Sequence, residues 1–179
     1  MQILGRAGHS LARYRDGVSD LESPTDDELM ALAIDEAHLA PAHGDVPVGA
    51  IVVVDGEIIA SRHNERQLTT DPTAHAEVLA MRDACEKLGT WRLDNAELIV
   101  TLEPCAMCAG ALVNARISRV VFGAPDLEAG ALGSVYNFGA DPRLRHNFEV
   151  VHNVLRDECS TALKEFFGEL RRARREGSP

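Results

Sequence analysis

From residue 25 to near its end, the chain alternates short β-rich segments with longer helical ones. Two β-rich segments, 48–54 and 57–61, are separated by Asp55-Gly56, a dipeptide that favours a two-residue hairpin turn. Three further strands are predicted downstream, at 97–102, 119–123 and 148–154. Five strands interleaved with helices predict an α/β domain, in which helices cover both faces of one sheet.

Helix boundaries are predicted from capping residues, apolar spacing and helix-breaking residues. Thr25 and Glu28 have the spacing of a capping box, and Pro41 should stop the helix that they begin. Pro104 fits the first turn of a later helix. The four predicted helices are 25–40, 73–88, 105–114 and 157–175. Residues 124–147 contain several glycines and prolines and are expected to form an irregular loop.

A chain of 179 residues is expected to form one compact domain. We place the only boundary near Pro24. Residues 1–24 are then an N-terminal extension, which we expect to be loosely ordered, and residues 25–170 are the folded domain. Residues 171–179 form a basic C-terminal tail.

Charge and hydropathy exclude several classes of protein. The formal net charge of −10 argues against a general basic coat for nucleic acid, because nonspecific affinity comes mostly from Lys and Arg. No apolar run, including the strand-sized run 50–54, approaches the roughly 20 residues of a membrane span. We therefore expect a cytoplasmic protein that does not associate with membranes. Four cysteines are too few for a disulfide scaffold in a chain of this length.

Cys105 and Cys108 form the most specific chemical motif in the chain. They lie three residues apart at the start of a predicted helix, where the unpaired N–H groups and the helix dipole favour thiolates. Together with His75 they make a His-Cys-Cys set that suits Zn²⁺ and leaves a fourth tetrahedral position for water.

Two other interpretations of the cysteine pair stay open on spacing alone. A structural zinc site would need Cys85 or Cys159 as a fourth ligand, and a redox dithiol would need neither His75 nor Glu77. Glu77 favours catalytic zinc, because a carboxylate beside a metal-bound water can carry its proton. Residues i and i+2 of a regular helix face different directions, so either His75 lies at the very end of the helix or Glu77 reaches round.

These residues match the H-x-E and P-C-x-x-C signature of the zinc nucleobase deaminases. Within that group the chain resembles the bacterial tRNA-specific adenosine deaminases over roughly residues 25–170. The resemblance is carried by residues 45–50, 71–77, 101–111 and 116–124 and by Phe166-Phe167. It implies the three-layer α/β/α fold of the cytidine deaminases, with a five-stranded mixed sheet.

The resemblance also implies roles for individual residues. His75, Cys105 and Cys108 would bind one Zn²⁺ per subunit, and Glu77 would be the catalytic proton shuttle. Two further residues, Asn64 and Asp126, would bind the substrate: the first would contact the base, and the second would meet the nucleic acid backbone at the rim.

The activity implied is the hydrolytic deamination of adenosine to inosine at the wobble position of a tRNA. The partners implied are a tRNA anticodon stem-loop and a second copy of the chain in a homodimer. One alternative is a deaminase of a free nucleobase or nucleoside, such as cytosine, guanine or cytidine. Another is a non-catalytic, zinc-stabilised RNA-binding module.

Other residues near the implied RNA surface allow more than one interpretation. Pro125 departs from the larger or basic residue that relatives tend to carry. Phe166 and Phe167 are either core residues or part of the pocket entrance. The arginines in 171–175 either complement a helix terminus or contact phosphate. Because residues 20–36 contain seven acids and no bases, the net negative charge does not argue against binding one small RNA loop.

Overall fold

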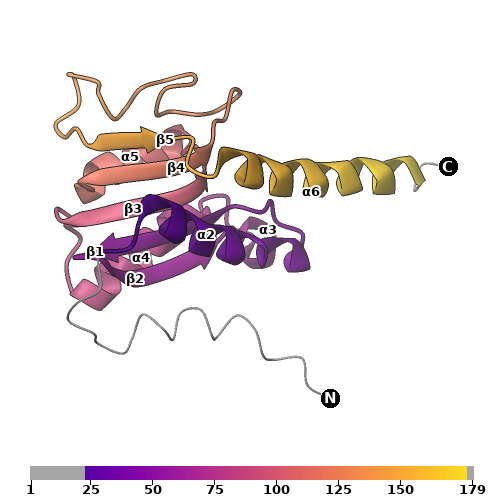
Figure 1. Cartoon of the computed structure of the whole chain (residues 1–179), viewed down its shortest axis with the longest axis horizontal. Helices are drawn as coiled ribbons and strands as arrows, with labels where there is room; N and C mark the ends of the chain where they lie inside the picture. Colours follow the sequence, from indigo (N-terminus) through magenta and orange to yellow (C-terminus); the bar gives the residue numbers. More distant parts are fainter. Residues whose placement is uncertain (1–22, 177–179) are drawn as a thin grey trace, which may run out of the picture.

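A computed structural model describes residues 23–176 of the chain (Figure 1). Five strands form one sheet in the order β2-β1-β3-β4-β5. The strands are β1 (Gly49–Val54), β2 (Glu57–His63), β3 (Ala96–Leu102), β4 (Arg119–Ala124) and β5 (Glu149–His152). Strand β1 pairs antiparallel with β2 and β3, whereas β3, β4 and β5 run parallel. The sheet is therefore mixed, as the resemblance implied.

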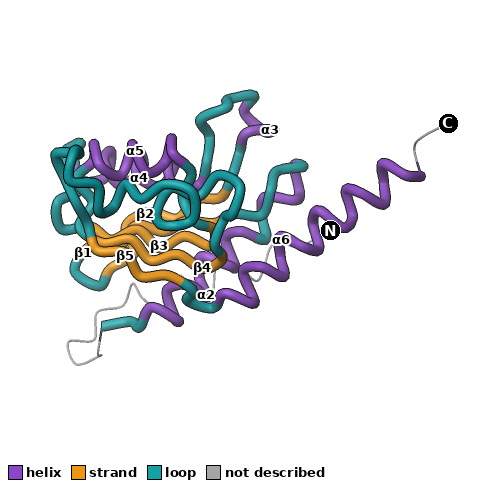
Figure 2. Tube along the Cα trace, turned by 90° about the horizontal axis from the view of Figure 1, so that it is seen from above, coloured by secondary structure: helices purple, strands orange, loops and turns teal. Residues whose placement is uncertain are grey.

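Helices cover both faces of this sheet, so the expected three-layer α/β/α arrangement is confirmed (Figure 2). The long helices are α2 (Asp26–Ala37), α4 (Ala76–Leu88), α5 (Ala106–Ala115) and α6 (Arg156–Glu176). Helices α4 and α5 lie on one face, and α2 and α6 lie on the other.

Strand β1 shows how the sequence builds two cores at once. Its side chains alternate between the faces of the sheet. Ala50 and Val52 are fully buried in the core beneath α4 and α5. Ile51 and Val53 are buried in the core on the α2 side. The preceding residue, Gly49, allows α2 to approach closely, because a Cβ there would overlap the backbone of that helix.

Two local predictions are confirmed by the backbone. Asp55 and Gly56 both have positive φ, 52° and 78°, as a two-residue hairpin turn requires. The Thr25 hydroxyl accepts from the Glu28 N–H, while the Glu28 carboxylate accepts from the Thr25 N–H, which completes the capping box.

Several helix boundaries differ from the prediction. Helix α2 ends at Ala37 instead of residue 40, and Pro41 lies inside a short 3₁₀ turn, η1 (Ala40–His43). This difference follows from Pro41, which has no N–H to donate to the Ala37 carbonyl and whose ring would clash with that carbonyl in a continued α-helix. A short helix that was not predicted, α3 (Arg66–Thr69), lies between β2 and α4.

Both helices that carry the zinc-site motif begin later than predicted. Helix α4 begins at Ala76 and α5 at Ala106, with His75 and Cys105 as their N-cap residues. The placement of Pro104 in the first helical turn is therefore wrong, since it precedes the N-cap. Strand β5 is also shorter than predicted.

The two ends of the chain differ in what the structure describes. The expected extension over 1–24 lies almost entirely outside the described residues. Helix α6 runs without a break through Arg171–Arg175 to Glu176. The predicted basic tail, 171–179, therefore begins inside this helix. Among residues 23–176, no helix is both long and apolar enough to cross a membrane.

Candidate metal centre and active site

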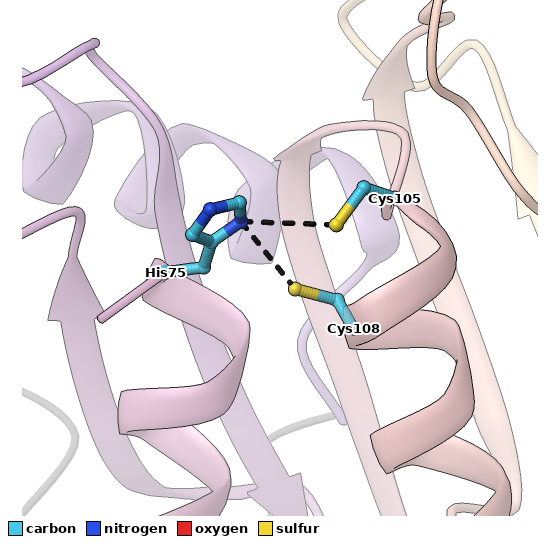
Figure 3. A group of neighbouring side chains, drawn as sticks. All are labelled: His75, Cys105 and Cys108. Atoms are coloured by element: carbon cyan, nitrogen blue, oxygen red, sulfur yellow. Dashed lines mark hydrogen bonds between the residues drawn. The ribbon is translucent and has the colours of Figure 1, made fainter. Parts of the chain in front are cut away.

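The N-termini of α4 and α5 bring His75, Cys105 and Cys108 together (Figure 3). His75 Nδ1 lies 3.8 Å from the Cys105 Sγ and 3.6 Å from the Cys108 Sγ. One nitrogen and two sulfur atoms within 4.8 Å of one another form a group that can hold a metal ion. Imidazole and thiolate are ligands that zinc prefers, and three of them leave the fourth tetrahedral position open. The donor set therefore fits a catalytic zinc ion.

The N-cap positions explain how the motif spacing works. His75 and Cys105 have extended backbones, with ψ of 148° and 173°, so each lies just before its helix. His75 therefore need not share a helical face with Glu77, which resolves the difficulty of the i, i+2 spacing. Cys108 is the third residue of α5, and the sulfur atoms of both cysteines point toward the His75 ring (Figure 3).

The two cysteines differ in how readily they lose a proton. Hydrogen bonding from Cys108 lowers the pKa of Cys105 to about 3, with burial opposing and His75 assisting. The pKa of Cys108 is raised, because its thiol bonds to Cys105 and is buried. The pKa of His75 is raised by its hydrogen bond to Cys105, against the effect of burial. The Cys105 thiolate is thus already favoured beside the imidazole without any metal. Metal binding would displace the proton of the Cys108 thiol.

Glu77 lies beside this group, in the first turn of α4. Its side chain is 3% exposed, and its Oε2 has no hydrogen-bond partner among the described residues. Burial raises the pKa of this carboxyl, although hydrogen bonds to its own N–H and to Cys108 oppose the shift. A buried carboxylate oxygen without a partner, next to a metal-binding group, is suited to accept and release a proton.

Residues 23–124 match the family model of the cytidine and deoxycytidylate deaminase zinc-binding region. The chain belongs to this deaminase family. Zinc is its cofactor, and the His-Cys-Cys group agrees with one ion per chain.

Individual relatives cover most of the deaminase. A tRNA-specific adenosine deaminase of Bacillus subtilis (strain 168) is 50% identical over 152 residues, which are 84% of this chain and 94% of the relative. A solved structure from work on A-to-I editing by tRNA:A34 deaminases is 43% identical, with a TM-score of 0.73, over 75% of this chain and 98% of that one. A guanine deaminase from Nitrosomonas europaea is 25% identical, with a TM-score of 0.66, over 87% and 91%.

Asn64 of the deaminase is hydrogen-bonded to the first residue of α4, which directly follows His75. Its Oδ1 accepts from the Ala76 N–H at 2.9 Å, and its Nδ2 donates to the Val46 carbonyl at 3.1 Å. The side chain is 7% exposed. His75 makes no side-chain cap, so Asn64 satisfies the first free N–H of α4 and fixes the start of that helix.

Asp126 lies in the loop that follows β4. Its Oδ1 accepts from the N–H groups of Glu128 and Ala129, at 3.0 and 3.1 Å. These contacts make it a turn-forming residue, and Pro125 precedes it in a half-buried position.

Glu103, for which no role was predicted, organises this loop. It is 2% exposed. Its carboxylate accepts from the N–H groups of Asp126, Leu132 and Ser134, each at 3.0 Å, and from the Ser134 hydroxyl. Burial acts to raise its pKa, but these hydrogen bonds outweigh burial and hold the pKa below the ordinary value.

The loop held by Glu103 lies against the candidate metal ligands at Cys105. Gly130 forms an isolated β-bridge with Cys105, and the Ala131 N–H donates to the Pro104 carbonyl at 2.8 Å. A Cβ at Gly130 would overlap the Glu103 carboxylate, so this position requires glycine. An acid directly before a Pro-Cys motif was the signal available in the sequence.

The aromatic pair and the arginines lie on α6. Phe166 is half-buried and Phe167 is 40% exposed, and their rings meet edge to face with centroids 5.4 Å apart. The helix continues outward beyond the sheet, and its last turns carry Arg171–Arg175 in exposed positions (Figure 1).

Proposed function

We propose that this deaminase converts adenosine to inosine at the wobble position of a tRNA anticodon. The observation that carries the proposal is the convergence of His75, Cys105 and Cys108 beside the buried, unpartnered Oε2 of Glu77. The substrate is supported by the relatives named as tRNA-specific adenosine deaminases, at 38–50% identity. A single-stranded loop suits such an enzyme, because its bases reach a pocket at low unstacking cost.

In this proposal His75 Nδ1 and the Sγ atoms of Cys105 and Cys108 hold the zinc. Zinc at this position would lower the pKa of a water molecule toward neutrality and so supply a nucleophile at physiological pH. The N-terminal ends of α4 and α5 stabilise the negative charge of the thiolates. The three ligands lie on two separate helices, so their spacing depends on the packing of the domain.

Glu77 carries the protons of the reaction. Its Oε2 accepts a proton from the attacking water and delivers it to N1 of the adenine ring, while oxygen bonds to C6. The carboxylate then takes the proton of the new C6 hydroxyl and passes it to the amino group. The C6–N bond breaks, ammonia leaves, and the oxygen on C6 becomes the carbonyl of inosine. A carboxyl whose pKa is raised by burial suits both directions of transfer, because its pKa lies nearer the operating pH.

Asn64 and Asp126 are proposed to bind the substrate. Each polar atom of the Asn64 amide already has one partner, but an amide has a second N–H and a second lone pair for a purine edge. Asp126 lies on the loop that contacts Cys105 through Gly130, which would place it at the rim of the site.

The proposal includes a homodimer in the cytoplasm, where tRNA is modified. Support for a second copy comes from large apolar side chains that the 125–148 loop leaves exposed: Leu127 at 80%, Val135 at 46% and Tyr136 at 56%. Sedimentation measurements should give twice the monomer mass, and Tyr136→Glu should shift the equilibrium toward monomer.

Mass spectrometry of tRNA incubated with the zinc-loaded protein tests the substrate. An adenosine-to-inosine change adds one dalton at an anticodon adenosine. We expect this gain on an anticodon stem-loop and far slower turnover of free adenine, guanine and cytidine. Equal turnover of free bases would favour the alternative that acts on small molecules.

A further inference from the structure

A second histidine pair lies outside the active site. His43 ends the turn η1, and His63 ends strand β2. Their Nε2 atoms are 3.2 Å apart, while the ring centroids are 5.2 Å apart, so the two Nε2 corners face each other. The side chains are 18% and 16% exposed.

Each imidazole is oriented by its own carboxylate. His43 Nδ1 lies 2.9 Å from Asp45 Oδ2, and His63 Nδ1 lies 2.6 Å from Glu36 Oε1. An ionised carboxylate only accepts hydrogen bonds, so each Nδ1 carries a proton, and in a neutral ring the Nε2 then presents a lone pair. Two lone pairs that face each other repel unless a cation lies between them.

The two carboxylates are themselves held in place. Glu36 Oε2 accepts from the Ser61 hydroxyl at 2.7 Å. The Asp45 carboxylate is 3% exposed and accepts from the backbone N–H groups of Gln67 and Leu68 in α3, at 3.0 and 3.3 Å. Histidines that ligate metals almost always donate their other ring N–H to such a fixed acceptor.

We propose that His43 and His63 form a second metal site, which binds a divalent ion that favours imidazole, such as Ni²⁺ or Zn²⁺, through both Nε2 atoms. Two nitrogen ligands at 2.0–2.1 Å in a tetrahedron are about 3.3 Å apart, close to the Nε2 spacing. The partial exposure of both rings leaves room for water molecules to complete the coordination. The site would tie η1 to the end of β2, one residue before Asn64, and it uses none of the ligands of the catalytic zinc.

Nickel is the probe for this site, because it can be counted separately from the catalytic zinc. Zinc-loaded protein is dialysed against micromolar Ni²⁺, and both metals are measured by mass spectrometry. We expect one nickel and one zinc per wild-type chain. His43→Gln and His63→Gln should each keep the zinc and bind nickel at least tenfold more weakly. His38→Gln is the matched control, because this exposed histidine lies in the same region and should leave nickel uptake unchanged.

X-ray absorption at the nickel edge identifies the ligands. The proposal requires scattering from two imidazole rings and none from sulfur. Wild-type protein that takes up no nickel would show that the pair shares only a proton, and so would overturn the proposal. Undiminished uptake by both histidine variants, or sulfur in the nickel shell, would overturn it as well. Circular dichroism checks that each variant is folded. His43→Gln and His63→Gln each remove one proposed ligand, so each tests the proposal on its own.

Discussion

Glu103→Gln removes one negative charge from the centre of the loop after β4, which lies against the candidate metal ligands. The Gln carbonyl oxygen can replace Oε1 and still accept from the N–H groups of Leu132 and Ser134. Its amide nitrogen then takes the place of Oε2, where it faces the Asp126 N–H. Two donors would then oppose each other in a nearly inaccessible position.

The expected loss of stability follows from these contacts. Hydrogen bonds to a charged group contribute about 1.5–3 kcal/mol each, and two of them involve Oε2. The Ser134 hydroxyl can rotate to accept from the amide, which recovers part of one bond, so we expect a net loss of about 3 kcal/mol. For a domain of this size that corresponds to a fall in Tm of about 6–12 °C.

Calorimetry of both zinc-loaded proteins measures this difference, with Glu86→Gln on the exposed side of α4 as the matched control. The pH dependence provides a second check. Because hydrogen bonds hold the pKa of Glu103 below its ordinary value, its stabilising effect is complete above the unfolded pKa of about 4.3. The effect is lost as pH falls through the folded pKa. The difference in Tm between wild type and Glu103→Gln should therefore be constant near neutral pH and become smaller in acid. A Tm change within 2 °C of the control at pH 7 would refute this account.

Three further predictions follow from single contacts. Asn64→Ala should lower the free energy of unfolding by about 1–2 kcal/mol, measured in urea, because the Ala76 N–H loses its acceptor, and an unchanged midpoint would contradict that. Gly49→Ala should destabilise by about 1–3 kcal/mol, since the new Cβ overlaps the backbone of α2 at Ala33. Gly110→Ala, inside α5, has open space for the Cβ and should be neutral or slightly stabilising. Removal of zinc with a chelator should lower the Tm and abolish activity, and both should return when zinc is added back, which rules out irreversible unfolding as the cause.

The features that the sequence predicts well are those encoded by neighbouring residues. The Asp55-Gly56 turn and the Thr25–Glu28 capping box each depend on residues at most three apart, and both are confirmed. The candidate metal ligands are also recognisable, because Cys105 and Cys108 form a short motif of unusual residue types, and the fold brings both close to His75.

The features that the sequence does not predict depend on contacts across the fold. The start of α4 is three residues late because its first N–H is capped by Asn64, twelve residues away, and not by a neighbouring Ser or Thr. The acceptors of the loop after β4 come from Glu103, across 23 to 31 positions in the chain. The facing of His43 and His63 likewise depends on the packing of η1 beside the end of β2. No local pattern encodes these distances.

The central claim is that zinc held by the His-Cys-Cys group and the proton carrier Glu77 together deaminate a wobble adenosine. The most direct test compares wild type with Glu77→Gln on one anticodon stem-loop, with zinc content measured on the same samples. We predict a one-dalton gain at the anticodon adenosine with wild type, and a loss of at least a thousandfold in rate with Glu77→Gln at equal zinc content and equal RNA affinity. Full turnover by zinc-loaded Glu77→Gln, or no mass change with zinc-loaded wild type, would contradict the account.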